Sequence, residues 1–134
     1  MFCRYSPMGR GMLTGQVKSY DDIPDGDLRK VMPRYFPKNF AVNISLVNEL
    51  EELAAIKGCT PAQLAIGWLV TLSRRNGLPT IIPIPGATKP QRVQENAAST
   101  RLSEVEMLKI DSLLREYKVV GDRYGTHAMK YVNG

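Results

Sequence analysis

Five polar side chains that could bind an anionic ligand follow a short apolar run. The run ends in Pro-Gly within IIPIPGATKPQRVQEN, residues 81–96, and a helix is predicted to begin near Lys89. The five residues are Thr88, Lys89, Arg92, Glu95 and Asn96. Their spacings of three and four residues place them on one side of the first two helical turns. Free backbone N–H groups and the helix dipole attract anions at such a helix start, and Gly86 lets the backbone approach a ligand.

The side chains of this segment allow two interpretations. Arg92 can form a bidentate pair with a phosphate or stack on a base, while Lys89 supplies a point charge. Glu95 would repel a phosphate, unless its carboxylate accepts a hydrogen bond from an amine such as that of adenine. The simpler interpretation is a solvated helix face on which Glu95 pairs with Arg92, three residues earlier.

A second loop is rich in glycine. The stretch YSPMGRGMLTG, Tyr5–Gly15, follows a brief apolar and aromatic lead-in and contains Gly9, Gly11 and Gly15. Glycines at this density let the backbone approach a ligand closely, although a tight connection would use them equally well. Because each loop follows a candidate strand, the two together favour one shared anionic ligand.

Composition argues against several other classes of protein. His127 is the single histidine, and Cys3 and Cys59 lack CxxC spacing, so we expect no metal site and two free thiols. The net charge of +5 comes from interleaved acidic and basic residues rather than from a basic run, so we expect no nucleic-acid partner. No apolar run approaches the roughly 20 residues of a membrane span. We expect a soluble, cytoplasmic protein without a membrane partner.

Hydrophobic periodicity and capping signals predict helices over about 43–58, 61–75, 89–98 and 103–117, and a strand over 80–84. Asn43 is the expected N-cap of the first helix, and capping boxes that begin at Thr60 and Ser103 open the second and fourth. The strand shows no alternation, so it should be covered on both faces. Pro83 and Pro85 cannot donate to a ladder, so the strand should end there. Residues 16–42 are interpreted as an irregular excursion with one helical turn near 27–31, and residues 118–134 as a polar tail.

This order of elements indicates part of an α/β protein. Helices that lead into a buried strand and then into further helices are typical of a parallel sheet. The chain offers only one clear strand and a short candidate at Phe2–Tyr5. Two parallel strands cannot cover their own faces and edges, so we predict that residues 1–134 form one partial domain.

Three ordered motifs carry a resemblance to a known family. The stretches YSPMGRGMLTG, GCTPAQLAIGWL and PIPGATKPQRVQEN resemble the C-terminal part of the aldo-keto reductases over nearly the whole chain. The resemblance implies a (β/α)8 TIM barrel that uses NADPH to reduce aldehydes and ketones. It makes Phe2–Tyr5 the end of strand seven and Thr80–Ile84 strand eight, whose loops often bind phosphate in barrel enzymes.

The resemblance also implies roles for individual residues toward NADP(H). Tyr5 would stack on the nicotinamide ring, and Glu95 with Asn96 would face adenine, which explains the carboxylate among the cations. The remaining implied contacts are Ser6, Met8, Gly9 and Arg10 along the pyrophosphate, and Gly86, Thr88, Lys89 and Arg92 around the adenosine 2′-phosphate.

No catalytic residue is assigned. The family's proton-donating Tyr and its Lys, Asp and His partners come from earlier strands, and no local sequence here matches their motifs. The leading hypothesis is therefore a C-terminal segment of an NADP-dependent aldo-keto reductase that retains cofactor-binding loops and is inactive alone. The complete fold would reduce a small aldehyde or ketone. The alternative is a non-catalytic protein that binds a nucleotide or associates with a full-length reductase subunit.

Overall fold

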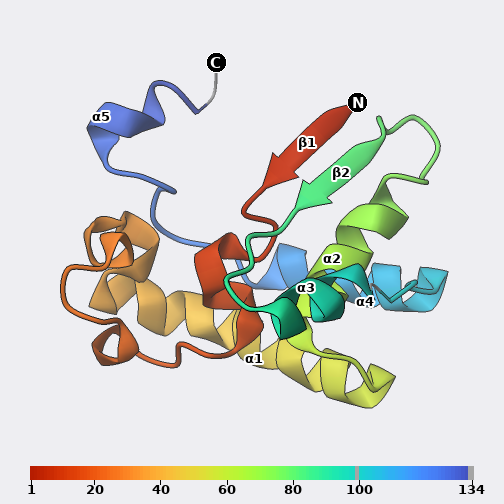
Figure 1. The fold of residues 1–134 in the computed structure, drawn as a ribbon, viewed down its shortest axis with the longest axis horizontal. Coiled ribbons are helices and arrows are strands. Elements are labelled where there is room, and N and C mark those ends of the chain that lie inside the picture. Colours follow the sequence, from red (N-terminus) through yellow and green to blue (C-terminus); the bar gives the residue numbers. More distant parts are fainter. Residues whose placement is uncertain (99, 133–134) are drawn as a thin grey trace.

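The computed structural model describes residues 1–98 and 100–132, which form a two-stranded parallel sheet flanked by helices (Figure 1). The strands are β1, Phe2–Tyr5, and β2, Ile81–Ile84. The helices are α1, Pro37–Lys57; α2, Pro61–Leu72; α3, Pro90–Ala97; α4, Glu104–Glu116; and α5, Thr126–Met129. Four short 3-10 helices lie between β1 and α1: η1, Gly9–Thr14; η2, Tyr20–Asp22; η3, Leu28–Val31; and η4, Pro33–Tyr35. The predicted α/β class is confirmed.

The strands pair in parallel, with Phe2 opposite Ile81 and Tyr5 opposite Ile84. The prediction that the strand ends at Pro83 and Pro85 is confirmed, because β2 ends at Ile84, although its pairing continues through Pro83. The N–H of Ile81 donates to Ser73 Oγ at 2.8 Å, on the side away from β1. Pro83, two residues later, presents its nitrogen on that same side, where the ladder to β1 needs no donor.

The expectation that the strands would be covered on both faces is also wrong for this chain. Phe2 is 64% exposed, Ile82 41% and Ile84 51%. Each strand has one neighbour in the described residues, and α2 packs against β2. The apolar side chains that the sequence provides for two covered faces therefore remain open to solvent.

Helix α1 begins at Pro37, six residues before the predicted N-cap, so the prediction for Asn43 is wrong. Asn43 is 3% exposed and lies inside the helix. Its amide group donates to the carbonyls of Arg34 at 3.1 Å and Val120 at 3.0 Å and accepts from the Val120 N–H at 2.8 Å. A residue type that favours helix starts is thus used here to join distant segments. The predicted end at Gly58 is confirmed by its left-handed φ of 73°.

Helix α2 begins where the capping box predicts. Thr60 Oγ1 accepts from the Gln63 N–H at 3.2 Å, and Gln63 Oε1 accepts from the Thr60 N–H at 3.0 Å. The helix ends at Leu72 rather than at Arg75. Burial on more than one side is confirmed by Leu64, Ile66 and Leu69.

Two hydrophobic clusters form the core. The first joins η1, the excursion and the first turns of α1, and comprises Met12, Val17, Ile23, Met32, Tyr35, Phe40 and Val47. The second lies among α1, α2 and α4, and comprises Ala54, Leu64, Leu102, Met107 and Ile110. The excursion therefore ends at Phe36, contains three short helices rather than one turn, and contributes side chains to the core.

Helices α3 and α4 match their predictions to within about two residues, and Ser103 caps α4 by accepting from the Glu106 N–H at 3.3 Å. The segment predicted as a tail without structure contains α5 and packs against α1 through Val120. The prediction for its last two residues, 133 and 134, lies outside the described residues.

Among residues 1–98 and 100–132, no single helix has the length and apolar composition of a membrane span. Helices α1 and α2 together have that length and composition, but they are bent by 88° at the break between them.

Candidate functional site

The two ligand loops predicted from the sequence leave the sheet at the same edge. Tyr5 and Ile84 are partners at the carboxyl ends of β1 and β2, so residues 6–8 and residues 85–89 both begin there. Parallel pairing produces this arrangement, because equivalent strand ends point the same way. The sheet thus brings together the starts of two loops that are almost 80 residues apart in sequence.

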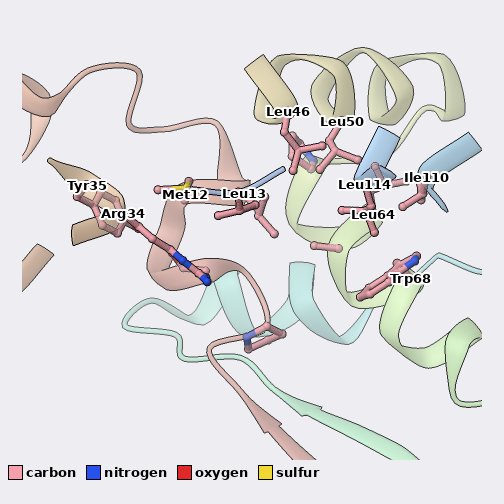
Figure 2. A pocket seen from close by; sticks show the side chains of 15 residues that line it. Met12, Leu13, Arg34, Tyr35, Leu46, Leu50, Leu64, Trp68, Ile110 and Leu114 are labelled. Carbon is pink, nitrogen blue, oxygen red and sulfur yellow. The ribbon is translucent and has the colours of Figure 1, made fainter. Parts of the chain in front are cut away.

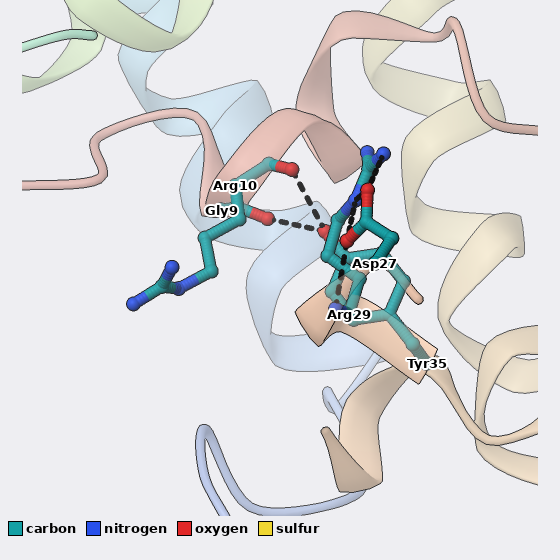
Figure 3. A network of polar contacts seen from close by, with 5 residues as sticks. All are labelled: Gly9, Arg10, Asp27, Arg29 and Tyr35. Carbon is teal, nitrogen blue, oxygen red and sulfur yellow. Dashed lines mark hydrogen bonds and ion pairs between the residues drawn. The ribbon is translucent and has the colours of Figure 1, made fainter. Parts of the chain in front are cut away.

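The loop after β1 has a tight backbone. Ser6, Gly9 and Arg10 have φ values of 48°, 58° and 56°, in the left-handed region that a side chain disfavours. Tyr35 stabilises this backbone geometry. Its hydroxyl donates to the carbonyl of Gly9 at 2.7 Å and lies 3.2 Å from the carbonyl of Arg10 (Figure 3). Burial raises the pKa of Tyr35, so the phenol remains a donor at neutral pH.

A carboxylate and a guanidinium lie beside this tyrosine. Asp27 caps η3 by accepting from the Arg29 N–H at 2.8 Å, and it also pairs with the Arg29 side chain at 2.7 Å (Figure 3). The hydrogen bonds from Arg29 lower the pKa of Asp27 to about 2. In the same view the guanidinium of Arg10 points away from this pair.

The end of β1 contacts the segment after α4. Arg10 donates from Nη2 to the Tyr124 hydroxyl at 2.7 Å, and the hydroxyl oxygens of Tyr124 and Tyr5 lie 3.4 Å apart. The guanidinium of Arg123 lies over the Tyr5 ring, 5.4 Å from its centroid. The contact between the hydroxyls raises the pKa of Tyr5 and, with the donor of Arg10, lowers that of Tyr124. Tyr5 is 39% exposed.

The loop after β2 is open. Gly86 has no atom within 4 Å of the position a Cβ would occupy, and Thr88 and Lys89 are exposed, with Lys89 in the N-cap position of α3. Arg92 Nη1 pairs with Glu95 at 3.2 Å. The intrahelical pair proposed as the simpler interpretation is therefore present. Asn96 follows on the same helix, partly buried.

The predicted site residues form two groups. Tyr5, Ser6, Gly9 and Arg10 line one small hollow, while Met8 precedes η1 outside it. The residues from Gly86 to Asn96 lie at α3. Within the described residues, no hydrogen bond or ion pair joins one group to the other.

Among the residues of the first group's hollow that the sequence did not predict are Arg34, Arg123 and Tyr124. Arg34 lies in η4, within the excursion, and the other two lie in the segment interpreted as a tail. One signal was present: Asn43 interrupts an apolar helix pattern, and a buried amide needs hydrogen-bond partners.

A separate apolar cavity of about 200 Å³ lies among η1, α1, α2 and α4 (Figure 2). Its walls include Met12, Leu13, Leu46, Leu50, Leu64 and Trp68. The Trp68 Nε1 is buried there and has no hydrogen-bond partner among the described residues. These walls belong to the two core clusters and their neighbours, and Arg34 is the one charged side chain among them. In residues 1–98 and 100–132, no group of three or more His, Cys, Asp or Glu side chains is arranged to hold a metal ion.

Comparisons with known proteins agree on one family. The sequence model described as "Aldo/keto reductase family" matches residues 1–115. The aldo-keto reductase yakc of Schizosaccharomyces pombe, whose name specifies NADP(+), is 38% identical over 90% of this chain and 34% of its own length. A putative pyridoxal reductase of Saccharomyces cerevisiae is 39% identical over 90% of this chain and 37% of its own.

A solved structure gives the same result for the fold. The glycerol dehydrogenase of Gluconobacter oxydans superposes with a TM-score of 0.71 at 25% identity, over 88% of this chain and 35% of that one. The chain thus spans about a third of the length of these relatives. Since the family model covers most of the chain and the backbone superposes on a member's, this chain belongs to the aldo/keto reductase family.

Proposed function

We propose that this chain is the C-terminal part of an NADP-dependent aldo-keto reductase barrel and that it carries the cofactor-binding loops. The observation that supports this proposal is the shared edge, from which a glycine-rich loop after β1 and a cationic loop after β2 both depart. Barrel enzymes have their sites at this edge, and phosphate often binds at the loops of the last two strands. In this proposal β1 and β2 are strands seven and eight.

The side chains present fit a dinucleotide with a 2′-phosphate. Lys89 is exposed at the start of α3, and Arg92 contacts Glu95 through Nη1 alone, which leaves its other donors for a phosphate. Tyr5 offers an exposed ring for the nicotinamide. In the proposed arrangement Ser6, Met8, Gly9 and Arg10 follow the pyrophosphate, Gly86, Thr88, Lys89 and Arg92 surround the 2′-phosphate, and Glu95 and Asn96 face adenine.

The complete fold would reduce a small aldehyde or ketone to an alcohol with hydride from NADPH. The relatives' names, an aldo-keto reductase, a pyridoxal reductase and a glycerol dehydrogenase, support a carbonyl and alcohol couple. We infer that this chain alone is inactive and assign it no catalytic residue, because its local sequence matches none of the family's catalytic motifs. We place the protein in the cytoplasm, on the composition argument given above.

The proposed roles of Lys89 and Arg92 predict a preference for NADPH over NADH. In the purified chain, Lys89→Ala and Arg92→Ala should each weaken NADPH binding about tenfold and leave NADH binding nearly unchanged, because each removes one charge-assisted contact to the 2′-phosphate. Titration calorimetry with both nucleotides measures this difference. Lys109→Ala, an exposed lysine on α4, is the matched control.

Two results would contradict the proposal. The first is equal affinity for NADPH and NADH in the unaltered chain, which would remove the role of the 2′-phosphate. The second is steady carbonyl reduction by this chain alone, which would mean that it contains catalytic residues that we have not assigned.

A second function, association with a full-length reductase subunit without catalysis, is favoured by the exposed apolar side chains of β1 and β2. Strands with unpaired edges and uncovered faces readily acquire a partner. Sedimentation of the chain mixed with a purified full-length aldo-keto reductase tests this function. A complex that forms with the unaltered chain but not with Ile82→Ser would support it, and two independently sedimenting species would reject it.

A further inference from the structure

The segment between α4 and α5 (Figure 1) is held in place by the buried amide of Asn43. Asn43 makes two hydrogen bonds to the backbone of Val120, and Arg34 Nε donates to the Gly121 carbonyl at 3.0 Å. Gly121 has a φ of 83°, and a Cβ there would lie 2.9 Å from the backbone of Arg34. Only glycine allows so close an approach in this conformation. The two residues that follow Asp122 are therefore positioned by the fold.

This anchor places Arg123 and Tyr124 at the loop after β1. Arg123 lies over the Tyr5 ring, and Tyr124 receives a hydrogen bond from Arg10. Together with Arg34 these residues line a hollow of about 50 Å³, which has room for a small group of a few heavy atoms.

Three arginine residues, Arg10, Arg34 and Arg123, line this hollow, and none of its lining residues is acidic. Among the described residues, Arg29, Arg75 and Arg92 each form an ion pair, but Arg10, Arg34 and Arg123 form none. Arg34 uses Nε for the Gly121 carbonyl, so its two terminal nitrogens remain as donors. Figure 2 shows its side chain extended away from Tyr35.

The surroundings of Arg34 disfavour its positive charge. Partial burial and the nearby charge of Arg123 lower the pKa of Arg34, and Asp122 opposes this effect only in part. A bound anion would offset the effect of a neighbouring cation on such a guanidinium group, and the planar fork of arginine matches phosphate oxygens.

We propose that Arg34 and Arg123, with Arg10 and the Tyr124 hydroxyl, form a phosphate-binding hollow at the carboxyl end of β1, to which the segment after α4 contributes. Identifying the ligand as the pyrophosphate of a dinucleotide rests on the proposed function. The proposed affinity for a phosphate group does not rest on that function, because it follows from the charges of the hollow alone. The same chemistry would suit a phosphate carried by the carbonyl substrate.

Inorganic pyrophosphate is the probe that separates the hollow from the rest of the nucleotide site. Calorimetric titration at constant ionic strength should detect binding to the purified chain, and Arg123→Gln should weaken it about tenfold or more, since a charge-assisted hydrogen bond is lost. Arg123→Lys keeps the charge without the fork and should weaken it by less. Arg101→Gln, an exposed arginine before α4, should bind pyrophosphate as the unaltered chain does. Circular dichroism checks that each variant is folded.

The source of the phosphate is tested by repeating the titration with saturating NADPH. Competition assigns the hollow to the dinucleotide, and independent binding assigns it to a phosphorylated substrate. The proposal of a phosphate-binding hollow is overturned if the unaltered chain does not bind pyrophosphate. It is also overturned if Arg123→Gln binds pyrophosphate as tightly as the unaltered chain does.

The hollow and the proposed function can fail separately. Pyrophosphate binding that depends on Arg123, without NADPH binding, would reject the proposed function and retain the hollow. NADPH selectivity that depends on Lys89, without an effect of Arg123→Gln on pyrophosphate binding, would retain the proposed function and reject the phosphate-binding hollow.

Discussion

At the scale of single residues, a few hydrogen bonds determine the shape of the candidate site. The Tyr35 hydroxyl supports two consecutive carbonyls beneath the loop after β1, which holds Gly9 and Arg10 in left-handed backbone conformations. Asp27 and Arg29 form the neighbouring contact (Figure 3). Each of these side chains comes from the excursion. Tyr35 therefore holds the backbone of loop residues that lie 26 and 25 positions earlier in the sequence.

The pKa of Asp27 predicts a pH-dependent contribution to stability. Arg29 lowers this pKa from 3.8 to about 2, so the folded state favours the ionised carboxylate. The resulting stabilisation is fully present above pH 3.8 and is lost as the pH falls through about 2. The free energy of unfolding of Asp27→Asn should therefore lie below that of the unaltered chain near neutral pH, with a difference that shrinks as the pH falls toward 2.

Urea unfolding at a series of pH values measures this difference. Asp21→Asn, which changes an exposed carboxylate of the same excursion, is the control and should change the unfolding free energy little. A difference for Asp27→Asn that does not change with pH would contradict the prediction, because it would mean that the pKa of Asp27 is the same in the folded and unfolded states.

At the scale of elements, α1 connects the parts of the chain. Its face carries apolar residues for both clusters, Phe40 and Val47 for the first and Ala54 for the second. Asn43 on the same helix holds the carbonyl of η4 and the segment after α4. The position of the glycine-rich loop and that of the segment facing it therefore depend on one helix.

Replacing Asn43 should weaken this connection. Asn43→Ala removes three hydrogen bonds and leaves a buried space and unpaired backbone groups, so we expect a loss of about 2 kcal/mol or more in the free energy of unfolding. Urea denaturation measures the loss, and Asn48→Ala on the exposed side of α1 should change it by less than about 0.5 kcal/mol. Since Asn43 anchors the segment after α4, the amide protons near Val120 should also exchange faster in the Asn43 variant. Equal exchange there would show that other contacts hold the segment.

At the scale of the whole molecule, the helices form the core and the sheet does not. Both clusters are built from α1, α2, α4 and the excursion, while β1 and β2 have one partner each in the described residues. The chain spans about a third of its relatives' length. Its apolar strand side chains are therefore more numerous than one neighbouring helix can cover.

This imbalance predicts unequal local stability. Amide protons of β1 and β2 in the purified chain should show protection factors at least tenfold below those in the middle of α1 and α2, because local opening of an exposed two-stranded ladder needs less free energy. Hydrogen exchange followed by mass spectrometry or NMR measures this, and sedimentation shows whether the sample is monomeric. Equal protection in a monomer would mean that two strands and α2 are sufficient for a stable sheet.

Local signals determined which elements the chain forms and where several of them begin and end. Thr60 and Gln63 specify the start of α2, Ser103 that of α4 and Gly58 the end of α1, because each acts on backbone groups within four residues. The expectation that an anionic ligand binds between Gly86 and Asn96 also follows from the residue types there. The roles of these residues toward NADP(H) remain a prediction, which rests on the family resemblance.

The tertiary structure decided what depends on contacts between distant segments. The sequence does not indicate that Asn43 joins Val120 rather than capping a helix, because its partner lies 77 residues away. Only the fold brings Arg34 and Arg123 to the loop after β1, since both lie in segments without a clear hydrophobic period. The exposure of Ile82 and Ile84 likewise depends on how many strands pair, which the sequence of a single strand cannot specify.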